Sequence, residues 1–198
     1  MFNETMSNET IRENLRLKII NFSRKNFKKI IILIIILFIF LCAFLFYNKL
    51  QEKNNIKIAE QYSQAALLVK QKKLFETKLL LENIINKSHQ FYSPLALYLV
   101  IDNNIEKDSK KIIAYFDKIL KNNKISKENL NLIKIKKAMY LIRLDKEELI
   151  VETLNPIINS NSIWKNMAIN LMIEYFLSKG QNFKAQEYIK ISNTKAKR

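Results

Sequence analysis

The sequence is poor in the residue types on which catalysis and metal binding most often depend. Its 198 residues include one His, one Cys, one Gly and one Trp. A single His and a single Cys cannot supply the clustered ligands of a zinc site, and one Gly cannot form a glycine-rich phosphate-binding loop. The His, His89, lies in the polar stretch NKSHQFY, where we expect a solvated loop. The sequence thus predicts no cofactor and no metal site.

Few other side chains are placed to catalyse a reaction. Glu147 and Glu148 are adjacent, so on a helix they point to different sides and are expected to be surface charges. Hydrolytic and redox enzymes need a convergent base, nucleophile or carboxylate pair. Carboxylate-only catalysis is the one enzymatic alternative that the composition leaves open. We therefore predict that the protein is not an enzyme.

The lone cysteine does not indicate a redox compartment. Cys42 has no partner for an intramolecular disulfide, and it lies inside a long apolar run. A lipoprotein signal would place the cysteine at the end of such a run, after a small residue. Cys42 instead follows Leu41 and precedes more apolar residues, so we expect no lipid on it.

Acidic residues are outnumbered, with 18 Asp and Glu against 34 Lys and Arg and a formal net charge of +16. Such a balance often indicates nucleic acid or anionic lipid as a partner. Lys, Asn and Ile are abundant and have A/T-rich codons, so compositional drift is an alternative source of the charge. Beyond the apolar run the charges are dispersed and Arg143 stands nearly alone, unlike the clustered Arg and aromatic residues of nucleic-acid modules. We predict no nucleic-acid partner.

The most prominent feature is the apolar run from Ile30 to Tyr47. As a helix it would be about 27 Å long, close to the roughly 30 Å hydrocarbon core of a bilayer. A secretory signal has a shorter apolar core, of about 7 to 15 residues, and a cleavage site with small residues. The run ends in the bulky residues FLFYNKL, so we predict an uncleaved transmembrane anchor at 30–47.

Positive charges flank this anchor unevenly. The preceding segment, 1–29, carries Arg12, Arg16, Lys18, Arg24, Lys25, Lys28 and Lys29. The residues that follow the anchor carry Lys49, Lys53 and Lys57. Because the more basic flank stays in the cytoplasm, we predict a single pass with 1–29 cytoplasmic, Arg24, Lys25, Lys28 and Lys29 acting as topology charges. In a diderm bacterium the anchor would lie in the inner membrane and the C-terminal domain in the periplasm.

Within 1–29, apolar residues recur at helical spacing beside basic ones, at Ile11, Leu15, Ile19 and Phe22 next to Lys18. This pattern favours an amphipathic helix on an anionic membrane surface. The alternative is a basic topology signal with little fixed structure.

Apolar residues recur at helical spacing throughout 48–192, without a strand pattern. The spacing predicts eight helices, over 56–73, 74–88, 93–106, 109–123, 126–144, 146–159, 162–180 and 182–192. Ser93 is an expected cap, with Pro94 as the first helical residue, and Ser126 starts a further helix. Short helices at this spacing are typical of stacked hairpins, each burying a face against its neighbour. We predict an all-α domain at 48–192, a right-handed α-solenoid of degenerate tetratricopeptide-like hairpins, and a basic, disordered tail at 193–198.

The last expected hairpin contains four residues with packing roles. Trp164 is predicted to plug the core beside Ile163 and Met167, although an exposed hot spot is the alternative. Ala168 and Ala185 are small enough for the paired helices to approach closely. Gly180 can take the left-handed conformation that ends a helix.

The layout of a basic segment, one span and a helical-hairpin domain resembles the family of ancillary Sec translocon subunits. At the residue level, 154–190 resembles that family's Leu-x-Pro-Leu, Trp, Ala-x-x-Leu, Gly-x-x-x-x-Ala pattern at Leu154, Pro156, Trp164, Ala168, Leu171, Gly180 and Ala185. The first hairpin departs from the pattern, since Thr77 and Lys78 stand where a small alanine is expected. Phe183 also comes one place later than in a standard repeat.

The resemblance implies a membrane-anchored protein-interaction scaffold. It implies association with the Sec translocon through the span, and contact with exported polypeptides or periplasmic chaperones through the hairpin domain. One alternative is a scaffold for outer-membrane assembly or division-coupled cell-wall synthesis. Another is a cytoplasmic role of the basic segment in recruiting lipid or a stress regulator, with the exported domain as a sensor.

Overall fold

The computed structural model describes the backbone of residues 2–193, and every regular element in that range is an α-helix. Residue 1 and residues 194–198 lie outside the described residues, as do the side chains of residues 2–15, 19, 22, 23, 30 and 34. The helices are α1 (Phe2–Lys70), α2 (Leu74–Asn86), α3 (Tyr92–Asp102), α4 (Ser109–Leu120), α5 (Lys127–Arg143), α6 (Glu147–Ile158), α7 (Lys165–Ser178) and α8 (Asn182–Asn193). The all-α prediction is confirmed for this part of the chain. The expected disordered tail lies outside it, apart from Asn193.

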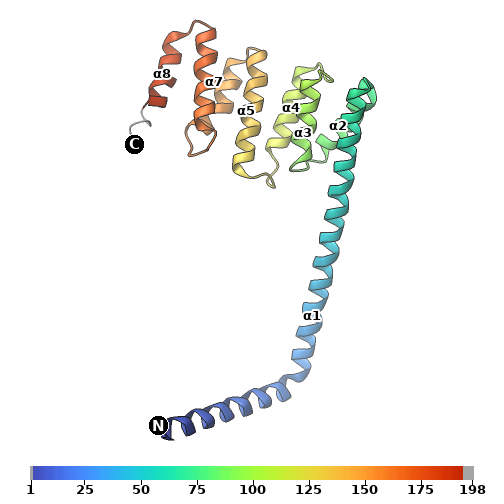
Figure 1. Cartoon of the computed structure of the whole chain (residues 1–198), viewed down its shortest axis with the longest axis vertical. Coiled ribbons are helices and arrows are strands. Elements are labelled where there is room, and N and C mark those ends of the chain that lie inside the picture. Colours follow the sequence, from blue (N-terminus) through green and yellow to red (C-terminus); the bar gives the residue numbers. More distant parts are fainter. Residues whose placement is uncertain (1, 194–198) are drawn as a thin grey trace. The chain divides into compact units, whose positions relative to one another are not determined.

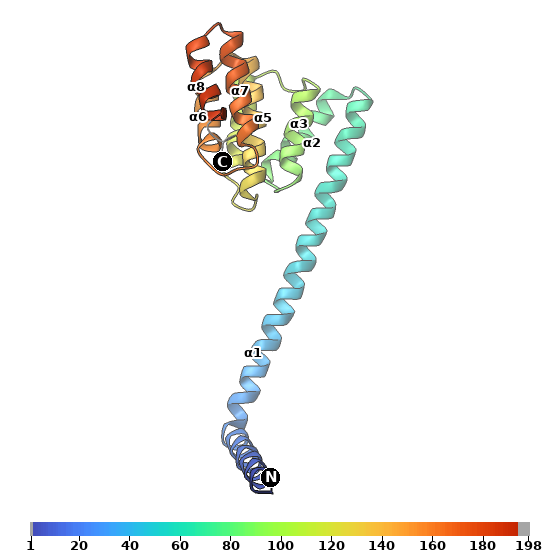
Figure 2. The same ribbon diagram turned by 60° about the vertical axis from the view of Figure 1, so that its left-hand side comes forward.

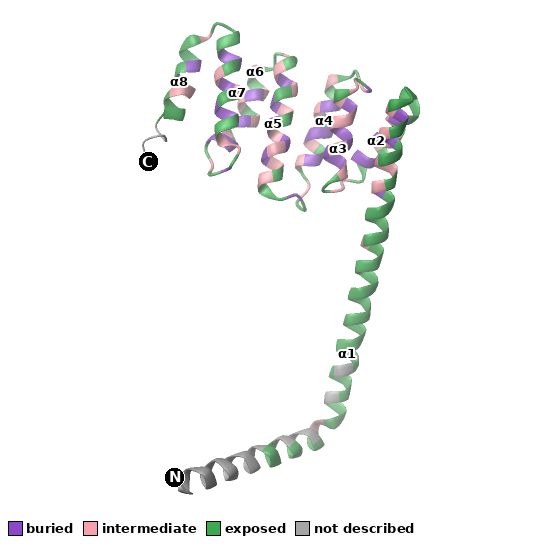
Figure 3. Cartoon of the chain, in the orientation of Figure 1, coloured by how far each residue is buried: buried purple, intermediate pink, exposed green. Residues whose placement is uncertain are grey.

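The chain divides into two compact units, residues 1–56 and 57–198. The described part of the first unit is one helix, the N-terminal part of α1. This helix is long and apolar enough to cross a membrane, since its most apolar window has a mean hydropathy of 3.4 and none of that window is buried (Figure 3). A helix satisfies its own backbone hydrogen bonds, as the interior of a bilayer requires.

The second unit combines the end of α1 with α2–α8. From α2 onward each helix contacts the next along the chain, and α5 also contacts α7 (Figure 1, Figure 2). The apolar side chains form two clusters, the first reaching from Ile58 to Ile133 and the second from Ile135 to Ala185. Ile133 and Ile135 are two residues apart on α5 and so point to nearly opposite sides of it. Helix α5 therefore joins the two clusters.

Polar side chains cap two helices where the chain turns. The Asp108 carboxylate accepts hydrogen bonds from the backbone N–H groups of Lys110 and Lys111 at the start of α4. The Ser126 hydroxyl accepts from the Asn129 N–H at the start of α5, at 3.4 Å. These caps satisfy N–H groups that have no partner inside the helix.

The start of α3 differs from the expectation. The helix begins at Tyr92, so Pro94 is its third residue and not its first. Ser93 does not cap the helix, because its hydroxyl accepts from the His89 N–H at 2.8 Å and donates to the Ile84 carbonyl at 2.7 Å. Ser93 is completely buried, and its bonds tie α3 to the end of α2. The prediction of a Ser93 cap is wrong.

His89 takes the capping role instead. Its Nδ1 accepts from the backbone N–H groups of Phe91 and Tyr92, at 3.1 Å each. The ring is half-buried, and burial together with the charge of Lys124 lowers the pKa of His89. A lowered pKa favours the neutral imidazole, which is the form that can accept a hydrogen bond. His89 thus lies in a loop, as expected, but its ring is half-buried and hydrogen-bonded and is not fully solvated.

Candidate functional site

The residues predicted to anchor and orient the chain lie on α1. Arg24, Lys25, Lys28 and Lys29 are exposed just before the apolar run, and Tyr47 is exposed at its end. The side chain of Ile30 lies outside the described residues. These charges and the run lie along one helix, which is long and apolar enough to cross a membrane.

The structure brings the four predicted packing residues together in the α7–α8 hairpin. Ala168 and Ala185 are completely buried in the second cluster. Gly180 follows α7 with a φ of +69°, in the left-handed region. Trp164 packs against the second cluster but is only half-buried, and its neighbours Ile163 and Met167 are exposed.

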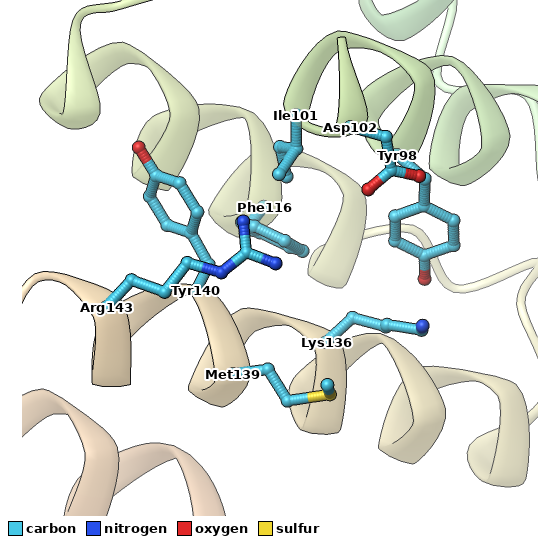
Figure 4. A pocket seen from close by; sticks show the side chains of 8 residues that line it. All are labelled: Tyr98, Ile101, Asp102, Phe116, Lys136, Met139, Tyr140 and Arg143. Carbon is cyan, nitrogen blue, oxygen red and sulfur yellow. The ribbon is translucent and has the colours of Figure 1, made fainter. Parts of the chain in front are cut away.

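A cleft of about 140 Å³ opens elsewhere, between α3, α4 and α5. Its lining residues are Tyr98, Ile101 and Asp102 from α3, Phe116 from α4, and Lys136, Met139, Tyr140 and Arg143 from α5 (Figure 4). Two turns of α5 supply four of them, because residues three, four and seven apart share one face of a helix. The packing of α3 and α5 on either side of α4 therefore creates the cleft.

The inner surface of the cleft is apolar and aromatic. Phe116 is completely buried, and its ring centroid lies 6.3 Å from that of Tyr140. Burial raises the pKa of Tyr98 to about 12 and also raises the pKa of Tyr140. Both tyrosines are thus neutral at pH 7, so they offer aromatic surface with a hydroxyl at the end.

The rim of the cleft is charged. Figure 4 shows Asp102 on the α3 side, with Lys136 and Arg143 on the α5 side and the Arg143 guanidinium directed towards Phe116. The Lys136 ammonium lies 5.8 Å from the centroid of the Tyr98 ring, within the range of a cation–π contact. The rim thus carries two cations and one carboxylate.

Five lysines and five carboxylates elsewhere in the second unit are paired with one another. The ion pairs are Lys78–Glu106, Lys111–Glu82, Lys111–Glu106, Lys137–Asp117, Lys179–Asp145 and Lys184–Glu147. Among the described residues, no ion pair includes Asp102, Lys136 or Arg143. The charges on the rim are therefore available to a ligand.

This arrangement is suited to binding. Apolar floor, aromatic walls and a few polar groups at the rim are the usual composition of a ligand site. Across the described part of the chain, no three His, Cys, Asp or Glu residues are placed to hold a metal ion. The cleft can accept a side chain on its floor and hydrogen-bond a charged group at its edge.

None of the eight lining residues was predicted as a site. The sequence held one signal, since Lys136 and Arg143 are seven residues apart and share a helix face with Met139 and Tyr140. The helix that lies opposite these residues is determined by tertiary packing, and local sequence patterns do not predict it. No protein-family model, curated protein or solved structure matches the chain.

Proposed function

We propose that the protein is a non-enzymatic, membrane-anchored scaffold that binds segments of other proteins in the cleft between α3 and α5. The observation that carries this proposal is the cleft itself, with its unpaired rim charges. It lies in a helical unit that follows a helix apolar enough to cross a membrane. Sites of this composition bind ligands by burial and hydrogen bonding.

The second unit is, in this proposal, a tetratricopeptide-like stack with hairpins formed by the end of α1 with α2, and then by α3–α4, α5–α6 and α7–α8. Three hydrogen bonds join residues 34 positions apart: Asn122 to the Ser88 carbonyl, Ser162 to Glu128, and Gln181 to Glu147. A tetratricopeptide repeat is also about 34 residues long. Recurrent contacts at this separation support equivalent hairpins stacked in order.

The departure at Thr77 is compatible with this stack. Thr77 is the fourth residue of α2, as Ala185 is of α8, and both are completely buried. The Thr77 hydroxyl donates to the Lys73 carbonyl at 2.8 Å, so its polar group is satisfied inside the fold. Thr77 therefore occupies the position at which the resemblance led us to expect a small alanine.

We further propose that the anchor places this unit on the periplasmic side of a bacterial inner membrane, beside the Sec translocon. The resemblance over 154–190 and the basic flank of the anchor support this narrower proposal. Tethering next to a pore raises the effective concentration of a binding site to about the millimolar range. A weak cleft would then suffice to hold exported polypeptides or periplasmic chaperones.

The test is affinity purification of the tagged full-length protein from membranes in a mild detergent, with partners identified by mass spectrometry. The matched control replaces 30–47 by an unrelated span of equal length. We expect translocon subunits in the first sample and their loss from the control. Recovery of outer-membrane assembly or division proteins alone would reject the translocon and favour the alternative scaffold. Recovery of no partner in either sample would argue against a scaffold.

A further inference from the structure

The lining of the cleft combines two cations with one carboxylate. Elsewhere in the unit six ion pairs, with N–O distances from 2.5 to 3.3 Å, join five lysines to five carboxylates. At the cleft, Lys136 and Arg143 face a single carboxylate, Asp102, and none of the three has an ion-pair partner among the described residues. The lining of the cleft therefore carries one more cation than carboxylate.

Arg143 is well suited to a carboxylate. Its planar guanidinium can donate two parallel hydrogen bonds to one carboxylate group, which an ammonium cannot do in the same way. The guanidinium is directed over the cleft towards Phe116 (Figure 4), so a carboxylate bound there would lie beside the apolar floor. Lys136 lies two turns away along α5, about 10 Å at 1.5 Å per residue. It adds a second positive charge without competing for the same oxygens.

The size of the cleft limits its apolar occupant. A volume of about 140 Å³ is close to that of a cavity, about 150 Å³, that holds a benzene ring. One Phe or Leu side chain can fill this space against Ile101 and Met139, above the completely buried Phe116. An extended peptide advances about 3.3 Å per residue. A carboxylate that binds Arg143 must therefore come from a residue close in the peptide sequence to the one whose apolar side chain fills the cleft.

We propose that the cleft selects peptide segments in which an apolar side chain is followed or preceded, within two residues, by a carboxylate. The apolar side chain fills the space above Phe116, and the carboxylate binds Arg143. Asp102 opposes this selection, because its charge repels the same carboxylate across the cleft. This inference rests on the proposed function and names the chemistry of the segments that the scaffold binds.

The test uses the full-length protein in nanodiscs of neutral lipid and the probe acetyl-Gly-Ser-Gly-Phe-Glu-Gly-Ser-Gly-amide. Matched probes replace Glu by Gln or Phe by Ala, and line broadening in the NMR spectrum of the peptide reports weak binding. We expect each replacement to weaken binding about tenfold, the effect of losing about 1.4 kcal/mol. A shortened probe, acetyl-Gly-Ser-Gly-Phe-Gln with a free C-terminal carboxylate, then separates the chain terminus from an acidic side chain as the source of the charge.

Variants of the protein identify the site. Arg143→Gln should lower the affinity for the Glu probe about tenfold and leave the affinity for the Gln probe unchanged. Asp102→Asn should raise the affinity for the Glu probe several-fold. An increase in affinity cannot result from misfolding. Lys127→Gln is the matched control, because Lys127 is an exposed cation of α5 that does not line the cleft.

Two results would overturn the inference. Equal binding of the Glu and Gln probes, or equal weakening of both by Arg143→Gln, would show that the cleft does not select a carboxylate. Failure of all probes to bind would reject the peptide chemistry stated here. The scaffold itself is judged separately, by recovery of partners with the native anchor, so the two failures can be told apart.

Discussion

Single residues after five helices adopt the left-handed backbone conformation, and four of them share one pattern of hydrogen bonds; the fifth is Ser88, with a φ of 50°. The four are Lys72, Asn104, Asp145 and Gly180, with φ values of 59°, 50°, 55° and 69°. In each case the following N–H bonds to the carbonyl five residues earlier, as from Gln181 to Phe176 at 2.9 Å. This arrangement closes the helix and satisfies its last carbonyls. Glycine adopts it without steric cost, whereas a residue with a Cβ does not.

Exchanges at two of these positions should change stability in opposite directions. In Gly180→Ala the added Cβ has no atom within 4 Å. The free energy of unfolding should therefore fall only by the backbone strain, about 1 kcal/mol. Lys72→Gly removes such strain at an exposed residue, but glycine also raises the conformational entropy of the unfolded chain. We expect a net increase of about 0.5 kcal/mol in the free energy of unfolding. Thermal unfolding followed by circular dichroism in detergent checks both. A lower melting temperature for Lys72→Gly would contradict the argument.

The Glu106 carboxylate links three segments of the second unit. It pairs with Lys78 at 2.9 Å and Lys111 at 3.3 Å, and it accepts from the backbone N–H groups of Lys107 and Asp108. Its side chain is only 8% exposed. The hydrogen bond from Lys78, followed by that from Asp108, lowers the pKa of Glu106 to about 2 from 4.5. Glu106 thus joins α2, the α3–α4 loop and α4.

Acidification should weaken this link in a defined pH range. Because the folded pKa of Glu106 is depressed, its contribution to stability is fully present above pH 4.5 and is lost as the pH falls towards 2. Glu106→Gln should cost about 2 kcal/mol at pH 7, and the difference from the wild type should shrink between pH 4.5 and 2. Denaturant unfolding at several pH values measures this. The control is Glu152→Gln, at an exposed carboxylate of α6. If the difference in unfolding free energy between the wild type and Glu106→Gln did not shrink at low pH, the assignment would be wrong.

Several of these residue-level features could be read from the sequence. Ser126 was recognisable as the start of a helix, and a lone glycine after an apolar periodic stretch indicated the turn at Gly180. The cap by His89 was not recognisable, because it depends on a short loop that places the imidazole against the start of the following helix, α3. The ion pair of Glu106 with Lys78 joins residues 28 positions apart in sequence, and helical periodicity does not predict which distant residues come into contact.

At the scale of elements, the α7–α8 hairpin depends on small side chains at its contact. Ala185 is completely buried in the second cluster, next along α8 to the exposed Gln186. A side chain larger than methyl at position 185 must displace packed neighbours, since protein interiors contain few voids. The same hairpin carries exposed apolar residues, including Phe183, which is 80% exposed.

Ala185→Leu should therefore destabilise the second unit by about 1 to 3 kcal/mol through overpacking. Gln186→Leu adds the same side chain one residue later, on the exposed side, and should change stability by less than about 0.5 kcal/mol. Chemical denaturation of both variants in the same detergent provides the comparison. Equal stability of the two variants would show that α8 does not depend on close approach at Ala185.

The helices could be predicted because they depend on local sequence, whereas the cleft could not because it depends on tertiary packing. Apolar residues three and four apart define a helix locally, so α2–α8 follow from short stretches of sequence. The cleft needs Tyr98 and Lys136 on facing sides of two helices 38 residues apart in sequence, with Phe116 between them. That juxtaposition depends on crossing angles and on which face each helix presents, which are set by the whole packed unit.

At the scale of the whole molecule, the function proposed here depends on which side of the membrane the second unit occupies. The basic residues on the N-terminal flank are the physical basis of the predicted orientation, because the flank with more Lys and Arg stays in the cytoplasm. Seven such residues precede the apolar run, and three follow it within the stretch up to Lys57. Replacing Arg24, Lys25, Lys28 and Lys29 by Gln would leave Arg12, Arg16 and Lys18, so the two flanks would carry three each.

Labelling of single cysteines can test this orientation directly. Because Cys42 is the one cysteine and lies in the apolar run, a Cys42→Ser background leaves the chain free of thiols. In spheroplasts of a diderm bacterial host, a membrane-impermeant maleimide should label Asn123→Cys in the exposed α4–α5 loop, and should label Ser7→Cys only after permeabilisation. With the four charges replaced by Gln, the bias is removed and both positions should become partly labelled in intact spheroplasts. Labelling of Ser7→Cys alone before permeabilisation would place the cleft in the cytoplasm, and the proposed contact with exported polypeptides would then be wrong.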